Sequence, residues 1–409
     1  MIDWKRNFLM VALSQFLSIM GFAFAMPFAP YYIQQLGITE PTELKKWVAL
    51  FTAAAALTLA VASPIWGALG DRYGRRIMLL RANFGGMLVL SLMGLVPDVK
   101  TLVILRLVQG ALTGTTTAAQ TFVSVQSPHN RSGVVLGTLS AAVFSGSMSG
   151  AFVGGLVAEW LGYRAAFMCS GVLLLAAGLL VLLGTREEFV RPVEENGSSM
   201  EDRARMFWDK IGPATPILAL ISIMGFVLLF DSAWMPLLVQ EINGGIKGAA
   251  FWTGSLQAAG GIAGFLAGPI IGRIADRISP PRIGKISAFG AGLMMTVVGL
   301  SQGFWQLFAG RFGAVFCAGG LDPVFQIWLT KTTPAQSRGF VFGWAVTARA
   351  LGWMAAPMAS GTVAWMFGLR AVFFISSALF FLLIPIITLI ARYLQPAPQP
   401  SAPIHAGRR

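Results

Sequence analysis

Long apolar segments separated by short polar turns fill nearly the whole chain. The apolar runs are centred near residues 20, 58, 87, 112, 146, 174, 226, 260, 293, 317, 351 and 381. Each run is long enough for a membrane-crossing helix, which needs about 20 mostly apolar residues. The runs are also rich in Gly, Ala, Ser and Pro, which membrane helices tolerate well. The pattern predicts an all-α membrane protein with twelve transmembrane helices.

The second half of the chain repeats the first. GALGDRYG at residues 67–74 aligns with GRIADRIS at 272–279, an offset of 205 residues. Further matches are Arg106 with Arg311, SPHNRSG with TPAQSRG, GYRAAF with GLRAVF, and Met26-Pro27 with Met235-Pro236. Several matches at nearly the same offset, 205 to 209 residues, indicate an internal duplication. Two six-helix halves are a known architecture of secondary transporters, with substrate bound near the midplane between them.

Composition marks the boundaries of the two halves. We expect a first six-helix half over 1–184, a cytoplasmic linker over 185–211, a second half over 212–392 and a disordered cytoplasmic tail over 393–409. The linker is charged and contains EENGSS, and the tail is rich in Pro. Segments of this kind bury too little apolar surface to fold by themselves.

The net charge of +13 reflects topology and not a nucleic-acid partner. The basic residues lie in short clusters between the apolar runs, and most fall in alternate turns and in the two tails. The turns on the opposite side hold six of the 30 Lys and Arg residues: Lys45, Lys46, Lys100, Arg164, Lys247 and Arg370. This asymmetry follows the positive-inside rule and predicts that both termini are cytoplasmic.

Catalytic and cofactor motifs are missing from the sequence. Cys169 and Cys317 both lie in apolar runs, and no cluster of His, Cys and acidic residues falls at one depth, so we expect no metal and no enzyme. The chain contains no G-x-x-x-x-G-K-[ST] loop, so we expect no direct use of ATP and no cofactor. A membrane enzyme or a non-transporting scaffold is therefore without support.

GALGDRYGRR, residues 67–76, resembles the signature loop of the major facilitator superfamily, G-x-L-x-D-R-x-G-R-[RK], at every defined position. Three further stretches resemble its drug:proton antiporter branch: PFAPYYIQQLG from Pro27, RLVQGALTG from Arg106 and GSMSGAFVGG from Gly146. Within that branch the chain resembles the MdtG-like multidrug efflux group. The resemblance implies a twelve-helix transporter of the inner membrane that exports hydrophobic or amphipathic molecules in exchange for protons. Its partners would be small molecules, protons and the lipid bilayer, and we expect a monomer.

The antiporter motif of the fifth helix departs from the family pattern at one position. Its residues here are Gly146, Gly150, Ala151, Gly154 and Gly155, and Ala151 stands where the branch carries Pro. The second half keeps that residue as Pro357. The departure keeps open a sugar or metabolite carrier, symporter or exporter, because a fold does not fix its substrate.

The signature loop predicts a contact that closes the cytoplasmic side. Gly67, Gly70 and Gly74 permit a tight turn and a close helix approach. Asp71 should lie near Arg338 at the N-terminus of the eleventh helix, where the helix dipole stabilises a carboxylate. In the second copy Asp276 should face Arg131, as the weaker latch. The remaining basic residues of the two loops should hold them toward the cytoplasm: Arg72, Arg75, Arg76 and Arg277.

Five ionisable residues are expected deep within helices: Arg106, Asp231, Arg311, Asp322 and Arg349. Charges at depth are expensive and are functional candidates by default. Depths taken at about 1.5 Å per residue pair Asp231 with Arg311 or Arg106, and Asp322 with Arg349. These pairs either serve structure alone or carry the coupled proton, because a carboxylate in a low dielectric titrates near neutrality.

The resemblance also implies that helices 1, 4, 7 and 10 line a substrate cavity. Aromatic side chains with few charges suit amphipathic compounds of varied shape. The expected lining residues are Gln15, Phe22, Phe24, Gln109, Thr113, Gln120, Trp234, Phe325 and Gln326.

Overall fold

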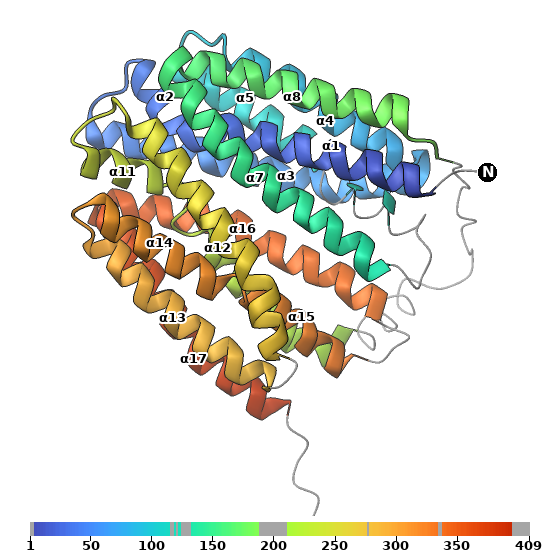
Figure 1. Cartoon of the computed structure of the whole chain (residues 1–409). Helices are drawn as coiled ribbons and strands as arrows, with labels where there is room; N and C mark the ends of the chain where they lie inside the picture. The colour runs from blue at the N-terminus through green and yellow to red at the C-terminus, as the bar shows by residue number, and fades with distance from the viewer. Residues whose placement is uncertain are drawn as a thin grey trace, which may run out of the picture.

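The computed structural model describes residues 4–114, 118–119, 122–123, 132–187, 211–275, 278–333 and 338–394. For several helical residues in these ranges, among them Asp71 and Arg338, it describes the backbone alone. Throughout the described ranges the regular elements are helices, with no β-strand, and they pack side by side (Figure 1). The expected all-α class is confirmed.

The first half of the chain forms one set of helices, coloured blue to green in Figure 1. Consecutive elements that continue one another are counted here as one helical path. The first path of this half is made of three elements, and its fourth path continues past α5 with helical residues at 118–119 and 122–123. The elements are α1 (Trp4–Ala25), η1 (Met26–Phe28), α2 (Ala29–Gln35), α3 (Pro41–Tyr73), α4 (Arg75–Met93), α5 (Val99–Leu112), α7 (Ser132–Leu161) and α8 (Tyr163–Gly184).

The second half forms a similar set, coloured yellow to red in Figure 1. Its elements are η3 (Gly212–Ala214), α10 (Thr215–Leu229), α11 (Met235–Asn243), α12 (Ala249–Ala275), α13 (Pro280–Leu300), α14 (Phe304–Ala318), α15 (Leu321–Thr332), α16 (Arg338–Phe367) and α17 (Leu369–Tyr393). Joined where one element continues another, the described helices give six paths in each half. The predicted architecture of two six-helix halves is confirmed.

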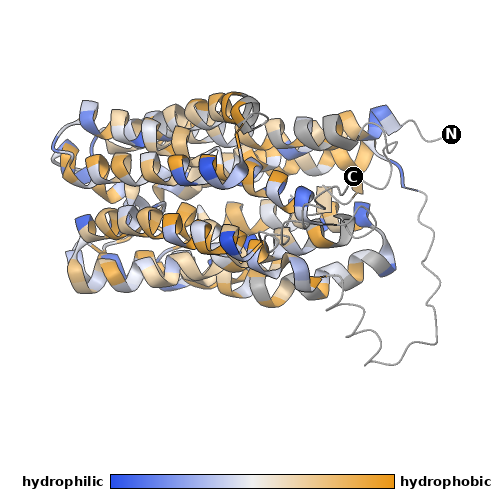
Figure 2. Ribbon diagram, turned by 90° about the horizontal axis from the view of Figure 1, so that it is seen from below, coloured by the Kyte–Doolittle hydropathy of each residue, from blue (hydrophilic) through white to orange (hydrophobic). Residues whose placement is uncertain are grey.

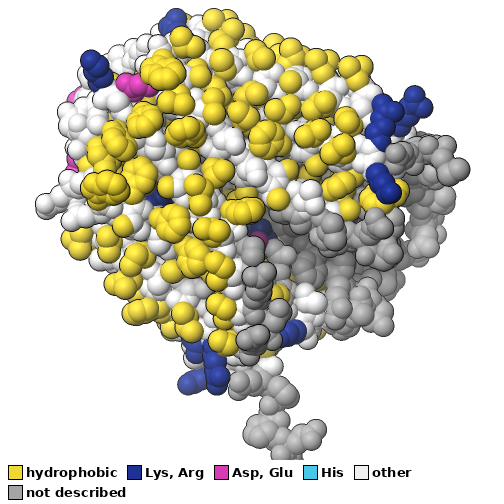
Figure 3. All heavy atoms as spheres, in the orientation of Figure 1, with side chains coloured by type: hydrophobic (Ala, Val, Ile, Leu, Met, Phe, Trp, Pro, Cys, Tyr) yellow, Lys and Arg dark blue, Asp and Glu magenta, His cyan; other side chains and the backbone are white. Residues whose placement is uncertain are grey.

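The outer surface of the bundle is that of a multi-pass membrane protein. Eight helical segments in the described part of the chain are long and apolar enough to cross a membrane by length and composition. Most hydrophilic residues lie toward the two ends of the bundle (Figure 2), and a broad face between them is apolar (Figure 3). Exposed Trp160, Trp305 and Trp365 lie near helix ends. Trp prefers that level because its ring is apolar and its N–H is polar.

Acidic caps start two of the helices. Glu40 precedes α3 and accepts hydrogen bonds from the backbone N–H groups of Thr42 and Glu43. Asp98 precedes α5 and accepts from the backbone N–H of Thr101. These hydrogen bonds hold the pKa of both carboxyls below their usual values. Both caps lie on the side where α2 and α11 end, here called the α2–α11 face (left in Figure 1).

Three helical paths are interrupted near a proline. The first bends through η1 at Pro27, the seventh opens into turns at 230–234 just before Pro236, and the tenth breaks at Gly319–Gly320 just before Pro323. Proline cannot donate a backbone hydrogen bond and clashes with the preceding turn of a helix. In transporters of two repeated halves, such interrupted helices carry the binding and coupling sites.

Glycines let the helices approach closely. A Cβ added at Gly146, Gly150 or Gly154 of α7 would overlap carbonyl oxygens of α1. On the neighbouring face of α7, a Cβ at Gly155 would lie 2.8 Å from the carbonyl oxygen of Ala250 in α12. Small residues are the usual solution where membrane helices must touch backbone to backbone. The predicted antiporter motif therefore packs α7 both on α1 and on α12 of the other half.

Candidate functional site

A buried ion pair lies at the interruption of the seventh path. An Arg311 Nη1 donates to Asp231 Oδ2 at 2.6 Å. The exposed fractions of the two side chains are 12% for Arg311 and 3% for Asp231. Asp231 stands in the turns between α10 and α11, where its carbonyl accepts from the backbone N–H of Trp234 at 3.0 Å. Of the two arginines that the sequence offered Asp231, the structure selects Arg311.

A second ion pair lies at the interruption of the tenth path. Asp322 is the second residue of α15, and its carboxylate lies 2.8 Å from an Arg349 Nη of α16. Gln326, one turn later, donates to the same carboxylate at 2.9 Å. The Asp322 side chain is 31% exposed. This pair is less buried than the Asp231–Arg311 pair, and both pairs lie within the second half.

Arg106 has no carboxylate partner among the described residues, which corrects the expectation of a charge pair. Its Nη1 donates to the thioether sulfur of Met26 at 2.9 Å and to the amide oxygen of Gln109. Its guanidinium carbon lies 4.7 Å from the centroid of the Phe51 ring. Its buried Nε finds no hydrogen-bond partner. The physical reason is the residue at each interruption. The first path is interrupted at Met26, which offers Arg106 a thioether, whereas the seventh path is interrupted at Asp231, which offers Arg311 a carboxylate.

Arg81 is a further buried basic residue, which charge counting alone assigns to a polar turn. It lies in α4, stacked 3.8 Å over the Trp66 ring, and donates to the carbonyl oxygen of Thr113 at 3.2 Å. Thr113 caps the C-terminal end of α5, where unpaired carbonyls carry negative partial charge. Arg81 could have been singled out from the sequence by its depth, because it lies six residues beyond the first residue of α4.

The signature loop is tighter than the sequence indicated. α3 continues to Tyr73 and α4 begins at Arg75, so Gly74 alone makes the turn, with φ of 98°. Gly67 has open space around it and Gly70 lies within the helix. Gly74 makes the tight turn, and Gly70 lies where α3 approaches α4, since an added Cβ there would lie 3.3 Å from the Met78 side chain.

An acidic residue from the start of the linker completes this loop. The two carboxylate oxygens of Glu187 accept from the backbone N–H groups of Arg75, at 3.1 Å, and Arg76, at 2.8 Å. The Arg76 side chain donates to the carbonyl oxygen of Leu182 at 2.6 Å, while Arg72 is exposed. Glu187 thus satisfies the free N–H groups that begin α4 and complements the helix dipole. No local motif marks Glu187 in the sequence.

Several predicted latch residues lie outside what the structure describes. They are the side chains of Asp71 and Arg338, and residues Arg131, Asp276 and Arg277. Gln120, expected in the cavity wall, also lies outside the described residues. The contacts predicted for them stay predictions.

Most of the predicted cavity residues are packed inside the bundle in this conformation, and their role in lining a substrate cavity stays a prediction. Trp234 is fully buried, and its indole N–H donates to Ser360 at 3.0 Å. Phe325 is fully buried against α13. Phe24, Gln15 and Gln109 are buried as well. Phe22, Thr113 and Gln326 keep partial exposure.

Hydrogen bonds join the two halves at the α2–α11 face. The Tyr31 hydroxyl donates to the carbonyl oxygen of Pro236 and lies 2.8 Å from the Thr253 hydroxyl. The Gln34 and Gln240 side-chain amides bond to each other in both directions at 2.8 Å. These contacts close the α2–α11 face of the molecule.

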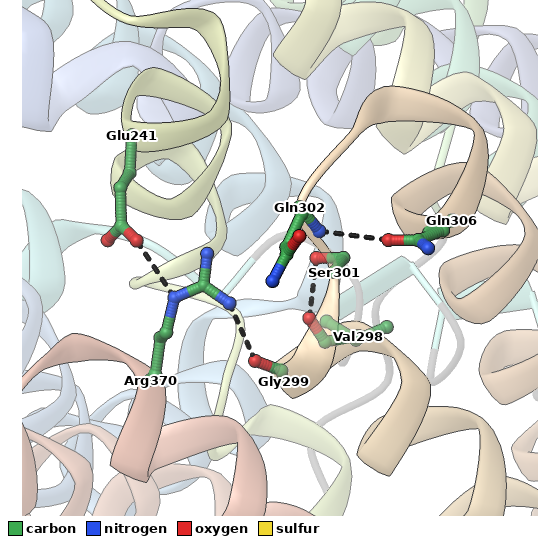
Figure 4. A network of polar contacts seen from close by, with 7 residues as sticks. All are labelled: Glu241, Val298, Gly299, Ser301, Gln302, Gln306 and Arg370. Atoms are coloured by element: carbon green, nitrogen blue, oxygen red, sulfur yellow. Dashed lines mark hydrogen bonds and ion pairs between the residues drawn. The ribbon is translucent and has the colours of Figure 1, made fainter.

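A further polar cluster braces the second half at the same face (Figure 4). Arg370 donates to Glu241 at the end of α11, at 2.8 Å, and to the carbonyl oxygen of Gly299 at 2.9 Å. In the first half, Arg164 donates to the carbonyl oxygen of Val96 at 3.3 Å. The arginines of the repeated GYRAAF and GLRAVF stretches therefore act at comparable places: Arg370 holds the last turns of α11 and α13, and Arg164 holds the loop that follows α4.

Comparison with known proteins places the whole chain in one family. The Major Facilitator Superfamily matches residues 11–298 and 253–409. Two curated relatives are named Multidrug resistance protein MdtG. The one from Citrobacter koseri is 33% identical over 379 residues, 92% of each chain, and the one from Serratia proteamaculans is 33% identical over 380 residues, again 92% of each. The crystal structure of a mutant of the nucleoside transporter NupG aligns with a TM-score of 0.76 at 13% identity, covering 94% of this chain and 99% of that one.

Proposed function

This chain belongs to the Major Facilitator Superfamily, and we propose that it exports hydrophobic and amphipathic small molecules from the cell in exchange for protons. The curated relatives, named for multidrug resistance, support this substrate class. Transport proceeds by alternating access, in which the two halves rock about a site between them. The chain is a monomer of the inner membrane in this proposal.

The membrane orientation follows from charge. Lys45, Lys46, Lys100, Lys247 and Arg370 all lie next to helix ends at the α2–α11 face. That face holds the smaller share of the 30 Lys and Arg residues, so the positive-inside rule places it outside the cell and places the turn at Gly74 in the cytoplasm. Both termini and the linker over 185–211 are then cytoplasmic, and the halves span 1–184 and 212–392.

The Asp231–Arg311 pair is the observation that carries proton exchange. The carboxylate is a group that can gain or lose a proton, whereas the guanidinium stays charged. Protonation of Asp231 removes one member of a buried ion pair and leaves Arg311 to find another acceptor. The pair sits where α10 gives way to α11, and α11 bonds to α2 of the other half through Gln240. Proton binding at Asp231 and the movement of the two halves therefore both affect the segment from the end of α10 through α11.

We assign this conformation to the state of the transport cycle that is closed on the outer side, because of the contacts at the α2–α11 face. With Tyr31 bonded to Pro236 and Gln34 bonded to Gln240, the outer side is closed. Export requires these contacts to break so that substrate leaves on that side. A ligand shifts such an equilibrium only through different affinities for the two states. Protonated and deprotonated Asp231 supply that difference.

Everted membrane vesicles test the proposed function. Vesicles from overexpressing cells are energised to acidify their lumen, and uptake of a panel of neutral, cationic and anionic fluorescent compounds is followed. We expect several chemically unrelated compounds to accumulate, and accumulation to stop when nigericin collapses the pH gradient. Vesicles with an empty vector are the control. Accumulation of one sugar or metabolite alone, or accumulation that survives nigericin, contradicts the proposal.

A further inference from the structure

Arg106 and Arg311 occupy equal places in the two halves. Each is the eighth residue of its helix, Arg106 in α5 and Arg311 in α14, and they are 205 residues apart, the offset of the repeat. Each reaches back 80 residues to the interruption of the first helix of its own half. The two arginines are therefore comparable sites in the same molecule.

The group that each arginine meets is different. Arg311 meets the carboxylate of Asp231 at 2.6 Å, whereas Arg106 meets the sulfur of Met26 at 2.9 Å. A thioether is a weak, neutral acceptor, and the Gln109 amide that completes the contact is also neutral. Among the described residues of the first half, the cation is kept and no anion pairs with it.

The surroundings of Arg106 leave its charge uncompensated. Among the described residues no carboxylate pairs with it, its buried Nε has no acceptor, and the face of the Phe51 ring covers one side. Arg311 and Arg349 also have a buried Nε without an acceptor, but each of them is paired with a carboxylate. A guanidinium in a membrane protein is expensive without an anion or strong acceptors. Arg106 and Met26 both keep partial exposure.

We propose that Arg106 binds the anionic group of an amphipathic compound, with Met26 and Phe51 contacting its apolar part. The bound sulfonate or carboxylate takes the place that Asp231 holds beside Arg311. Guanidinium groups bind such planar or multi-oxygen anions through two N–H donors, and the unbonded Nε makes one available. This inference rests on the proposed export function and names a substrate class for it: amphipathic anions.

Two dyes with the same ring skeleton test the proposal. 1-Anilinonaphthalene-8-sulfonate carries a sulfonate, and N-phenyl-1-naphthylamine is the same molecule without it. Affinities for both are measured by equilibrium dialysis with the full chain in phosphatidylcholine nanodiscs, with empty nanodiscs subtracted. The readout is the ratio of the two affinities, which removes changes in general apolar binding.

Met26→Asp rebuilds in the first half the ion pair of the second. We expect it to lower the sulfonate-to-neutral affinity ratio by about tenfold, because the introduced carboxylate competes for Arg106. Arg106→Gln should lower the ratio by a similar factor through loss of the cation. Arg370→Gln also removes one positive charge, at an exposed site on the α2–α11 face, and should keep the wild-type ratio.

The outcomes separate this inference from the proposed function. A ratio unchanged in both Met26→Asp and Arg106→Gln overturns the anion site, and so does an equal loss of both dyes in Met26→Asp. Retained binding of the neutral dye shows that a variant is folded. The vesicle experiment decides export independently, so export of panel compounds together with an unchanged ratio refutes the anion site alone.

Discussion

The Asp231 carboxylate and the Arg311 guanidinium form a 2.6 Å ion pair in which the carboxylate is 3% exposed. Removing one member of a buried pair leaves an uncompensated charge, which costs about 3–5 kcal/mol. We therefore expect Arg311→Met to lower the unfolding temperature of the purified protein strongly. The double variant Asp231→Asn with Arg311→Met should recover much of the loss, because no charge is then left unpaired.

The exposed Glu241–Arg370 pair is the matched control for this thermal measurement. Its side chains are 46% and 35% exposed, and exposed pairs contribute about 0–1 kcal/mol. Glu241→Gln should thus shift the unfolding temperature little. Equal shifts for Arg311→Met and Glu241→Gln would mean that the Asp231–Arg311 pair is as weak as a surface pair.

Glu187 offers a second prediction, on the cytoplasmic loop. Glu187→Gln keeps a hydrogen-bond acceptor but loses the negative charge beside the N-terminus of α4, so we expect a loss of about 0.3–1 kcal/mol. The loss should shrink in high salt, because the interaction is electrostatic. Thermal unfolding at two salt concentrations measures both effects. A loss that is independent of salt would point to packing and not to the dipole.

A third prediction concerns closure of the outer face by Gln34 and Gln240. Cys169 and Cys317 are first replaced by Ala, and Gln34 and Gln240 are then replaced by Cys. A short bifunctional thiosulfonate reagent should join the two introduced cysteines, because the native side chains meet at 2.8 Å. The cross-link should stop transport, and a reducing agent should restore it. Each single-cysteine variant, treated alike, is the control. Transport at the wild-type rate with the cross-link intact would show that the face need not open.

The sequence was sufficient for the architecture because membrane helices and repeats have strong local signals. Periodic apolar runs gave the helical paths, and the offset between Arg106 and Arg311 located equal sites in the halves. The pair Asp322–Arg349 followed from depth along two helices. Apolar runs, repeats and depths along a helix are properties that a sequence specifies directly.

Contacts between distant helices were the part that the sequence left undetermined. Sequence matching aligned Met26 with Met235, whereas the arginine contacts equate Met26 with Asp231, four residues earlier. Four residues are about one helical turn, so both alignments keep the same face and the pattern does not choose between them. Glu187 reaches Arg76 across 111 residues, a pairing set by how α8 lies beside α4. The Trp234 indole likewise reaches Ser360 of α16 across 126 residues.

Proton coupling through Asp231 is the central claim, and gradient-driven transport in proteoliposomes tests it most directly. A radiolabelled compound that the wild type transports is supplied outside vesicles with an acidic lumen, and exchange without a gradient is measured in parallel. In Asp231→Asn we expect gradient-driven uptake to fall to the level of empty liposomes while exchange continues, with Asp322→Asn as the matched variant that keeps both. Gradient-driven uptake at the wild-type level in Asp231→Asn would contradict the account.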